Sequence, residues 1–139
     1  MPDLDRLLEE SDYVLLACPL TDQTRGLVNA TRLSKMKSTA VLINVARGGV
    51  VVEEDLWDAM TTHKIAGAII DVWWGEHGSG DVSQQGRPWH TLENVAMTPH
   101  ASGWTYEGAE GRRIADVAKN IDAVDGGAPL INLIVDGRK

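Results

Sequence analysis

Short apolar runs alternate with amphipathic segments along this sequence, and that alternation restricts the fold more than any other feature. Four runs have the length and apolar character of strands, and the first of them suits a strand buried on both faces of a sheet. They cover Tyr13–Cys18, Ala40–Val45, Ala66–Trp73 and Val95–Thr98. The other segments have the apolar spacing of helices, and they cover Leu4–Glu10, Arg32–Lys37, Glu53–His63 and Tyr106–Val124. Strands separated by helices form mostly parallel sheets with right-handed crossovers, so the pattern predicts an α/β fold.

The predicted helices differ in the quality of their first turns. Thr31 is a preferred N-cap residue and stands directly before Arg32–Lys37. The helix at Glu53–His63 opens with three acidic residues, which complement the positive end of the helix dipole. Val52 occupies its capping position and has no side-chain oxygen, so we expect this helix to begin without a side-chain cap.

Composition excludes several classes of protein. With 139 residues, 43% hydrophobic and 24% charged, the chain has the make-up of one compact globular domain. The net charge of −7 and the scattered lysines and arginines are unlike a nucleic-acid-binding surface. The apolar runs are too short to cross a bilayer, and no His, Cys or Asp cluster has metal-ligand spacing. The single cysteine, Cys18, is typical of a reducing compartment, so we expect a cytoplasmic protein without nucleic-acid or membrane partners.

Three chemically capable residues stand at the ends of successive strands of the predicted sheet: Arg47, Asp71 and His100. In an open α/β sheet the carboxyl ends of the strands line the crevice in which ligands bind. A guanidinium holds a carboxylate through paired hydrogen bonds, and a histidine titrates near neutral pH, which suits it to proton transfer. Two plainer interpretations remain: His100 as a solvated loop residue, and Asp71 as a capping or salt-bridging group whose burial requires a partner.

Three stretches make a resemblance to a known family specific. They read SDYVLLACPLTDQTRGLVNATRLSKMK, MKSTAVLINVARGGVVVEEDL, and GAIIDVWWGE followed by MTPHASG. In this order and spacing they resemble the D-isomer-specific 2-hydroxyacid dehydrogenases, in which two doubly wound domains hold NAD or NADP between them. The resemblance implies that residues 1–128 form the second half of a dinucleotide-binding domain, with a partial Rossmann-like, doubly wound sheet. It also implies that residues 129–139 return toward a substrate domain, while the Gly-x-Gly-x-x-Gly turn of the first half does not occur in the sequence.

The same resemblance implies roles for individual residues. His100 becomes the general acid–base in the interconversion of a small D-2-hydroxy acid and a 2-keto acid, with NAD or NADP carrying the hydride. Glu76 orients this histidine and raises its pKa, and Arg47 holds the substrate. A homodimer is implied for the complete protein. The implied cofactor-lining positions are Pro19, Thr24, Val45, Ala46, Arg47, Asp71, His100, Ser102 and Gly103.

Two other interpretations stay open. In the first, the chain is a catalytically incompetent fragment, because no glycine-rich turn is present in the sequence to receive the pyrophosphate, or it is an NAD-sensing interaction module, because the family includes corepressors. Alternatively, it is a Rossmann-like domain with unrelated chemistry. We predict that the isolated chain binds NAD weakly and self-associates through a bare strand edge at Tyr13–Cys18. Trp73 and Trp74 are expected to close the core rather than stack on a ligand.

Overall fold

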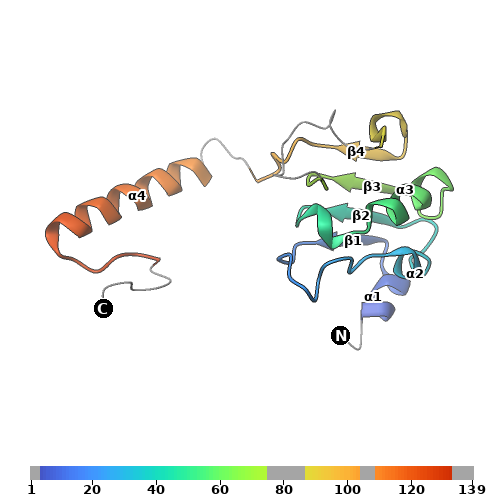
Figure 1. Ribbon diagram of the computed structural model, residues 1–139, viewed down its shortest axis with the longest axis horizontal. Helices are drawn as coiled ribbons and strands as arrows, with labels where there is room; N and C mark the ends of the chain where they lie inside the picture. The colour runs from blue at the N-terminus through green and yellow to red at the C-terminus, as the bar shows by residue number, and fades with distance from the viewer. Residues whose placement is uncertain (1–3, 75–86, 104–108, 133–139) are drawn as a thin grey trace. The chain divides into compact units, whose positions relative to one another are not determined.

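The computed structural model describes residues 4–74, 87–103 and 109–132, and it divides into two compact units, Met1–Ser102 and Gly103–Lys139. The first unit carries the sheet (Figure 1). Its elements, in chain order, are α1 (Leu4–Glu10), β1 (Tyr13–Leu16), α2 (Ala30–Leu33), β2 (Val41–Asn44), the 3₁₀ turn η1 (Gly48–Val50), α3 (Glu53–Thr61), β3 (Gly67–Ile70), the 3₁₀ turn η4 (Trp89–Thr91) and β4 (Val95–Met97).

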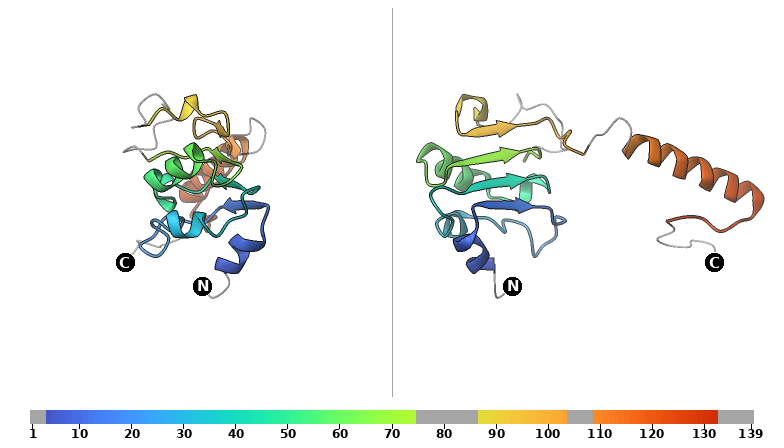
Figure 2. Two further views of the ribbon diagram at one scale, coloured as in Figure 1. Left: turned by 90° about the vertical axis from the view of Figure 1, so that its right-hand side faces the viewer. Right: turned by 180° about the vertical axis from the view of Figure 1, so that it is seen from behind.

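The four strands form one parallel sheet in the order β1-β2-β3-β4, which confirms the predicted α/β class (Figure 2). Each strand is shorter than its apolar run and lies within it. One row of register partners crosses the whole sheet at the carboxyl ends of the strands. It consists of Leu16, Asn44, Ile70 and Met97. Because every strand points the same way, whatever follows these four residues leaves the sheet at one edge.

The helices of the first unit cover only one face of this sheet. Leu8 of α1, Leu33 of α2 and Leu56 of α3 are fully buried in a single cluster with alternate strand residues. The residues between them on β1 remain open, with Tyr13 72% and Leu15 60% exposed. The prediction of strands buried on both faces was therefore wrong for this strand. A continuous apolar run shows that both faces of a strand can be buried, but the described helices pack against only one face of β1.

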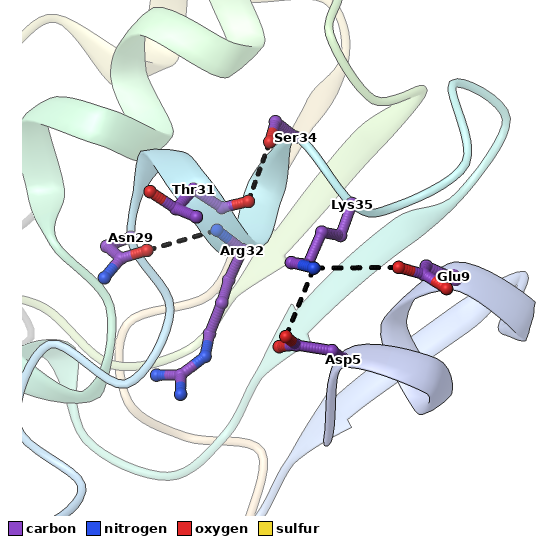
Figure 3. A network of polar contacts seen from close by, with 7 residues as sticks. All are labelled: Asp5, Glu9, Asn29, Thr31, Arg32, Ser34 and Lys35. Atoms are coloured by element: carbon purple, nitrogen blue, oxygen red, sulfur yellow. Dashed lines mark hydrogen bonds and ion pairs between the residues drawn. The ribbon is translucent and has the colours of Figure 1, made fainter. Parts of the chain in front are cut away.

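Polar contacts fix the short helices α1 and α2 against each other (Figure 3). The Lys35 ammonium lies 3.1 Å from Asp5 and 3.7 Å from Glu9, so ion pairs join the segment just after α2 to α1. Hydrogen bonding and Coulomb attraction from Asp5 are the main causes that raise the pKa of Lys35 above its ordinary value. The two helices are thus held by charge at their solvent-facing side and by leucines beneath.

The start of α2 corrects the predicted cap. The helix begins at Ala30, and Asn29 is its N-cap, because the Asn29 side chain accepts a hydrogen bond of 3.1 Å from the Arg32 amide. Thr31 lies inside the first turn, where its carbonyl accepts from the Ser34 hydroxyl at 2.7 Å (Figure 3). Asparagine ranks above threonine as a cap, and its placement two residues earlier decided the helix start.

Helix α3 begins at Glu53 as predicted, and Val52 makes no side-chain cap. The carboxylate of Asp55, in the first turn of α3, accepts a 2.7 Å hydrogen bond from the Ala30 amide at the start of α2. The acidic opening of α3 therefore does more than complement its own dipole. It also satisfies a free N–H at the start of the neighbouring helix.

The second unit is built around α4, which runs from Ala109 to Gly126. The next residue, Gly127, has a positive φ of 66°. Asn120 fastens the following turn, because its side chain both donates to the Ile131 carbonyl and accepts from the Ile131 amide. The helix exposes an apolar stripe made of Ile114, Val117, Ile121 and Val124. Across the described ranges of both units, no helix combines the length and apolar character needed to cross a membrane.

Candidate functional site at the carboxyl edge of the sheet

The register of the sheet brings the predicted site residues to one edge. The row of partners Leu16, Asn44, Ile70 and Met97 ends the four strands, and the residues three positions after it can be compared. They are Pro19 after β1, Arg47 after β2, Trp73 after β3 and His100 after β4. Strands β2 and β4 flank β3, and adjacent strands lie about 4.8 Å apart, so the exits that carry Arg47 and His100 are roughly 10 Å from each other. A cation and an imidazole separated by 53 positions in the sequence thus follow strands that end at the same edge, with one strand between them.

The turn that carries Arg47 is built from a buried amide and a glycine. Asn44, 1% exposed at the end of β2, accepts from the Ala46 amide at 3.1 Å and donates to the Arg47 carbonyl at 3.2 Å. A Cβ atom on Gly48 would lie 2.2 Å from the Trp73 carbonyl oxygen, so only glycine allows the exits of β2 and β3 to approach this closely. The Arg47 side chain itself is exposed, and its guanidinium donates to the Ala46 carbonyl at 2.7 Å.

Asp71 is buried, with 2% of its surface exposed, and its carboxylate binds the loop that carries His100. One oxygen accepts from the Thr98 hydroxyl at 2.5 Å and from the amides of Ala101 and Ser102 at 2.9 and 3.1 Å. The other accepts from the Ser102 hydroxyl at 2.6 Å. The cost of burying a carboxylate is thereby offset by four donors, and Asp71 caps the loop in the manner of the plainer interpretation.

These contacts also determine the charge state of Asp71. Burial on its own would raise the pKa of this carboxyl. The hydrogen bonds from the Ser102 and Thr98 side chains, joined by those from the Ser102 and Ala101 amides, outweigh that effect and lower the pKa below its usual range. Asp71 is therefore a fixed negative charge beneath the loop at neutral pH. Its predicted contact with a cofactor stays a prediction.

His100 is exposed and adopts a left-handed backbone conformation, with φ of 57°. Non-glycine residues adopt this region infrequently, although histidine does so more often than most. The residues on both sides of His100 are the ones bound to Asp71, so the clamp holds the histidine in this conformation at the open edge of the sheet. The residue is thereby left exposed at the edge rather than packed into the core.

A pocket of about 580 Å³ opens at the ends of β1 and β2. Its walls are mostly small or apolar residues, with Arg47 as the charged group. The lining residues are Ala17, Cys18, Pro19, Leu20, Val45, Ala46 and Arg47. Four predicted site positions are thus brought together around one cavity, and Cys18 is partly buried in its wall.

The other predicted positions have different placements. Thr24 is not a lining residue of this pocket; its hydroxyl donates to the Pro19 carbonyl at 2.7 Å and accepts from the Thr21 amide, so it shapes the loop after β1. Ser102 is bound to Asp71, as described above. Gly103 begins the second unit, and Glu76 lies outside the described residues, so the structure places neither of them at the site.

Tryptophans brace the exit of β3. The indole N–H of Trp73 donates to the Thr98 carbonyl at 3.0 Å, and that of Trp74 donates to the Val51 carbonyl at 2.7 Å. Trp74 also stacks on the buried Trp89, with ring centroids 5.5 Å apart. These contacts agree with the expectation that Trp73 and Trp74 are structural. They join the exit of β3 to the His100 loop on one side and to the end of η1 on the other.

Two elements of the site escaped sequence reasoning. Asn44 and Gly48 were not singled out, although each has a visible signal. Asn44 is a lone polar residue at the end of an apolar run, and Gly48 is the first of two consecutive glycines after Arg47. The packing partner of Gly48, by contrast, is the backbone of Trp73, which no local pattern identifies.

Comparison with known proteins identifies the family of this chain. Residues 1–102 match the family model described as the D-isomer specific 2-hydroxyacid dehydrogenase, NAD binding domain. The chain is 37% identical over 135 residues to a mitochondrial formate dehydrogenase of Hordeum vulgare, and the match covers 96% of this chain and 34% of that protein. It is 42% identical over 124 residues to glyoxylate/hydroxypyruvate reductase B of Escherichia coli, covering 89% and 37% of the two proteins.

A solved structure extends the likeness to three dimensions. The D-isomer specific 2-hydroxyacid dehydrogenase of Xanthobacter autotrophicus Py2, in complex with NADPH and MES, superimposes with a TM-score of 0.75 at 36% identity. The match covers 99% of this chain and 53% of that one. The chain therefore spans about a third to a half of the proteins that it matches here.

Proposed function

Because this chain belongs to the D-isomer specific 2-hydroxyacid dehydrogenase family, we propose that it forms the reacting edge of an NAD- or NADP-dependent oxidoreductase. The reaction is the interconversion of a small D-2-hydroxy acid and the corresponding 2-keto acid. The observation that carries the proposal is the emergence of Arg47 and His100 at equivalent positions of one sheet edge, two strands apart.

Each residue has a role that its chemistry suits. In the oxidation direction His100 accepts the hydroxyl proton of the substrate, and in the reverse direction it returns a proton to the keto oxygen. Arg47 binds the carboxylate and keeps the reacting carbon near the imidazole. A nicotinamide cofactor bound at this edge would supply the acceptor or donor of the hydride. Asp71 does not touch the substrate in this proposal, and it holds the loop that presents His100.

The residues at this edge fit one end of the cofactor. The pocket beside Arg47 has small and apolar walls, which suit a flat ring, and Pro19, Val45 and Ala46 are the residues proposed to line it. The pyrophosphate has no matching cradle in the described residues. The short helix α2 has its start occupied by the side chains of Asn29 and Asp55, which leaves those N–H groups unavailable to an anion.

The remaining expectations are retained as proposals. Residues 1–128 are proposed to be the second half of a dinucleotide-binding domain, and residues 129–139 to lead toward a substrate domain. A homodimer is proposed for the complete protein, and the single cysteine, Cys18, supports a cytoplasmic location. Glu76 is proposed to orient His100.

A segment exchange tests the proposed reaction. Residues 4–102 replace the matching segment of glyoxylate/hydroxypyruvate reductase B of Escherichia coli, and NADH or NADPH oxidation is followed with glyoxylate and with hydroxypyruvate. We expect turnover, and we expect His100→Ala to lower kcat by about 10²- to 10⁴-fold, the usual contribution of general acid–base catalysis. His63→Ala is the matched control, because His63 is also exposed with a positive φ of 52° but precedes β3 at the other edge.

The outcomes separate the alternatives. If a folded chimaera turns over and His100→Ala behaves like His63→Ala, the acid–base assignment is wrong and unrelated chemistry is favoured. If the folded chimaera binds the nicotinamide cofactor but has no turnover, the interaction-module interpretation is favoured instead.

A further inference from the structure

A buried amide at the end of β2 is not used by the proposed reaction as stated above. Among the described residues, Asn44 and Asp71 are the buried polar side chains. Asp71 holds the loop of His100, whereas nothing in the proposed chemistry requires an amide inside β2. The other three residues of this strand are Val41, Leu42 and Ile43. A polar group in such a place is retained when its hydrogen bonds define a local conformation.

The hydrogen bonds of Asn44 span the turn that leads to Arg47. Its Oδ1 accepts from the Ala46 amide at 3.1 Å, and its Nδ2 donates to the Arg47 carbonyl at 3.2 Å. Both bonds are made to backbone groups, so they fix the path of the chain rather than the position of another side chain. The carbonyl of Asn44 in turn accepts from the Asp71 amide at 3.0 Å, which ties this turn to β3.

The residue after Arg47 is held equally firmly. Gly48 packs against the Trp73 backbone so closely that no side chain fits between them. The backbone of Arg47 therefore lies between two fixed points, the Asn44 amide before it and the Gly48 contact after it. The guanidinium, which donates to the Ala46 carbonyl at 2.7 Å, lies at this exposed edge, and Arg47 lines the pocket.

We propose that Asn44 is a positioning residue for Arg47, and that its side-chain donor to the Arg47 carbonyl sets the angle at which the guanidinium meets a carboxylate. This inference rests on the proposed function, in which Arg47 binds the substrate. It predicts that disturbing the amide weakens binding of the 2-keto acid much more than it slows the chemical step, because His100 is held independently by Asp71.

Asn44→Asp isolates the donor. The carboxylate keeps the size of the amide and keeps an acceptor for the Ala46 amide, but it has no hydrogen to give to the Arg47 carbonyl. Asn94→Asp is the matched control. The Nδ2 of Asn94 donates to the Met60 carbonyl at 3.1 Å, before β4 and away from the carboxyl edge, so the same chemical change is made to the same kind of bond.

The first measurement uses the 139-residue chain and needs no activity. Amide hydrogen exchange and backbone order parameters are recorded by NMR for each variant. We expect Asn44→Asp to lower the order parameter of Arg47 while the Ala46 amide stays protected, and we expect Asn94→Asp to leave Arg47 unchanged. An unchanged Arg47 backbone in a folded Asn44→Asp variant would overturn the inference. Asn44→Leu, which removes both bonds, should also release the Ala46 amide.

The second measurement uses the chimaera described above. We expect Asn44→Asp to raise KM for glyoxylate about tenfold with kcat within threefold of the parent, and Asn94→Asp to change neither by more than twofold. Lowering the pH should shrink the KM defect of Asn44→Asp relative to the parent, since protonation of the introduced carboxyl restores a donor. In an Arg47→Lys background, Asn44→Asp should add less than twofold, because both changes then act on one interaction.

Failure of this inference differs from failure of the proposed function. If Arg47→Lys raises KM and Asn44→Asp does not, Arg47 binds substrate without help from Asn44, and the inference is wrong. If Arg47→Lys itself leaves KM and kcat unchanged, the proposed role of Arg47 is wrong and the inference falls with it. Equal effects of Asn44→Asp in both Arg47 backgrounds would assign the amide a structural role only.

Discussion

The closest backbone approach in the site yields a sharp prediction about stability. In Gly48→Ala, the new methyl group would meet three backbone atoms at once: the Trp73 carbonyl oxygen at 2.2 Å, the Trp73 carbonyl carbon at 2.5 Å and the Trp74 nitrogen at 2.9 Å. None of these atoms can move without displacing the exit of β3. The exits of β2 and β3 must therefore separate, and the contacts between them loosen.

The expected cost follows from the number and kind of the clashes. Overpacking by one methyl group typically costs about 1–3 kcal/mol, and a clash with backbone places this case at the upper end, about 3 kcal/mol. With an m value of about 1.5 kcal/mol/M, the urea midpoint should fall by about 2 M. Unfolding of the 139-residue chain is followed by tryptophan fluorescence, because Trp73, Trp74 and Trp89 lie in the affected region.

The neighbouring glycine provides the control. Neither Gly48 nor Gly49 has a positive φ, so alanine is allowed at both by backbone conformation. A Cβ on Gly49 would meet only the flexible ends of Leu20 and Arg25, at 3.3 and 3.5 Å. Gly49→Ala should therefore stay within about 1 kcal/mol of the parent. Equal midpoints for the two alanine variants would refute the reasoning, because it depends on what the methyl group touches and not on its presence.

Three further predictions concern other parts of the first unit. Asp71→Asn should cost about 3 kcal/mol in the free energy of unfolding at pH 7, since charge-assisted hydrogen bonds are replaced, and an unchanged urea midpoint would contradict this. Because the pKa of Asp71 is lowered on folding, its ionised carboxylate contributes to the free energy of unfolding above its ordinary pKa of 3.8, and this contribution is lost as the pH falls through the lower folded value. In acid titrations the free energy of unfolding should therefore decline less steeply for Asp71→Asn than for the parent. The pKa of Lys35 is raised on folding, so its charged ammonium contributes to the free energy of unfolding below its ordinary pKa of 10.5, and this contribution is lost as the pH rises through the folded value. Lys35→Met should therefore be less stable than the parent at pH 8 but little different from it at pH 12. Leu15→Lys on the open face of β1 should reduce the predicted self-association of the chain, as measured by sedimentation velocity. Glu10→Lys is the control, because Glu10 is exposed at the end of α1. If the two variants associate equally, the contact between chains lies elsewhere.

Local pattern was sufficient for the class of fold and for the location of the four strands, α1 and α3. The apolar runs enclose all four strands, and the acidic opening at Glu53 marks the start of α3. The start of α2 was misplaced because two capping residues, Asn29 and Thr31, compete within one short segment, and the stronger cap is used. Burial of β1 was overestimated, since the composition of a strand does not reveal how many helices cover it.

The sequence by itself determined that a cation and an imidazole follow parallel strands, and parallel strands leave a sheet at a common edge. It could not determine how either residue is held there. The partners of Asp71 lie 27 to 31 positions further along the chain, and the backbone that requires a glycine at position 48 is that of Trp73. Hydrogen bonds and steric contacts act over a few ångströms in space, irrespective of separation along the chain. Only folding therefore decided that Asp71 anchors the loop of His100 and that Gly48 lies against the backbone of Trp73.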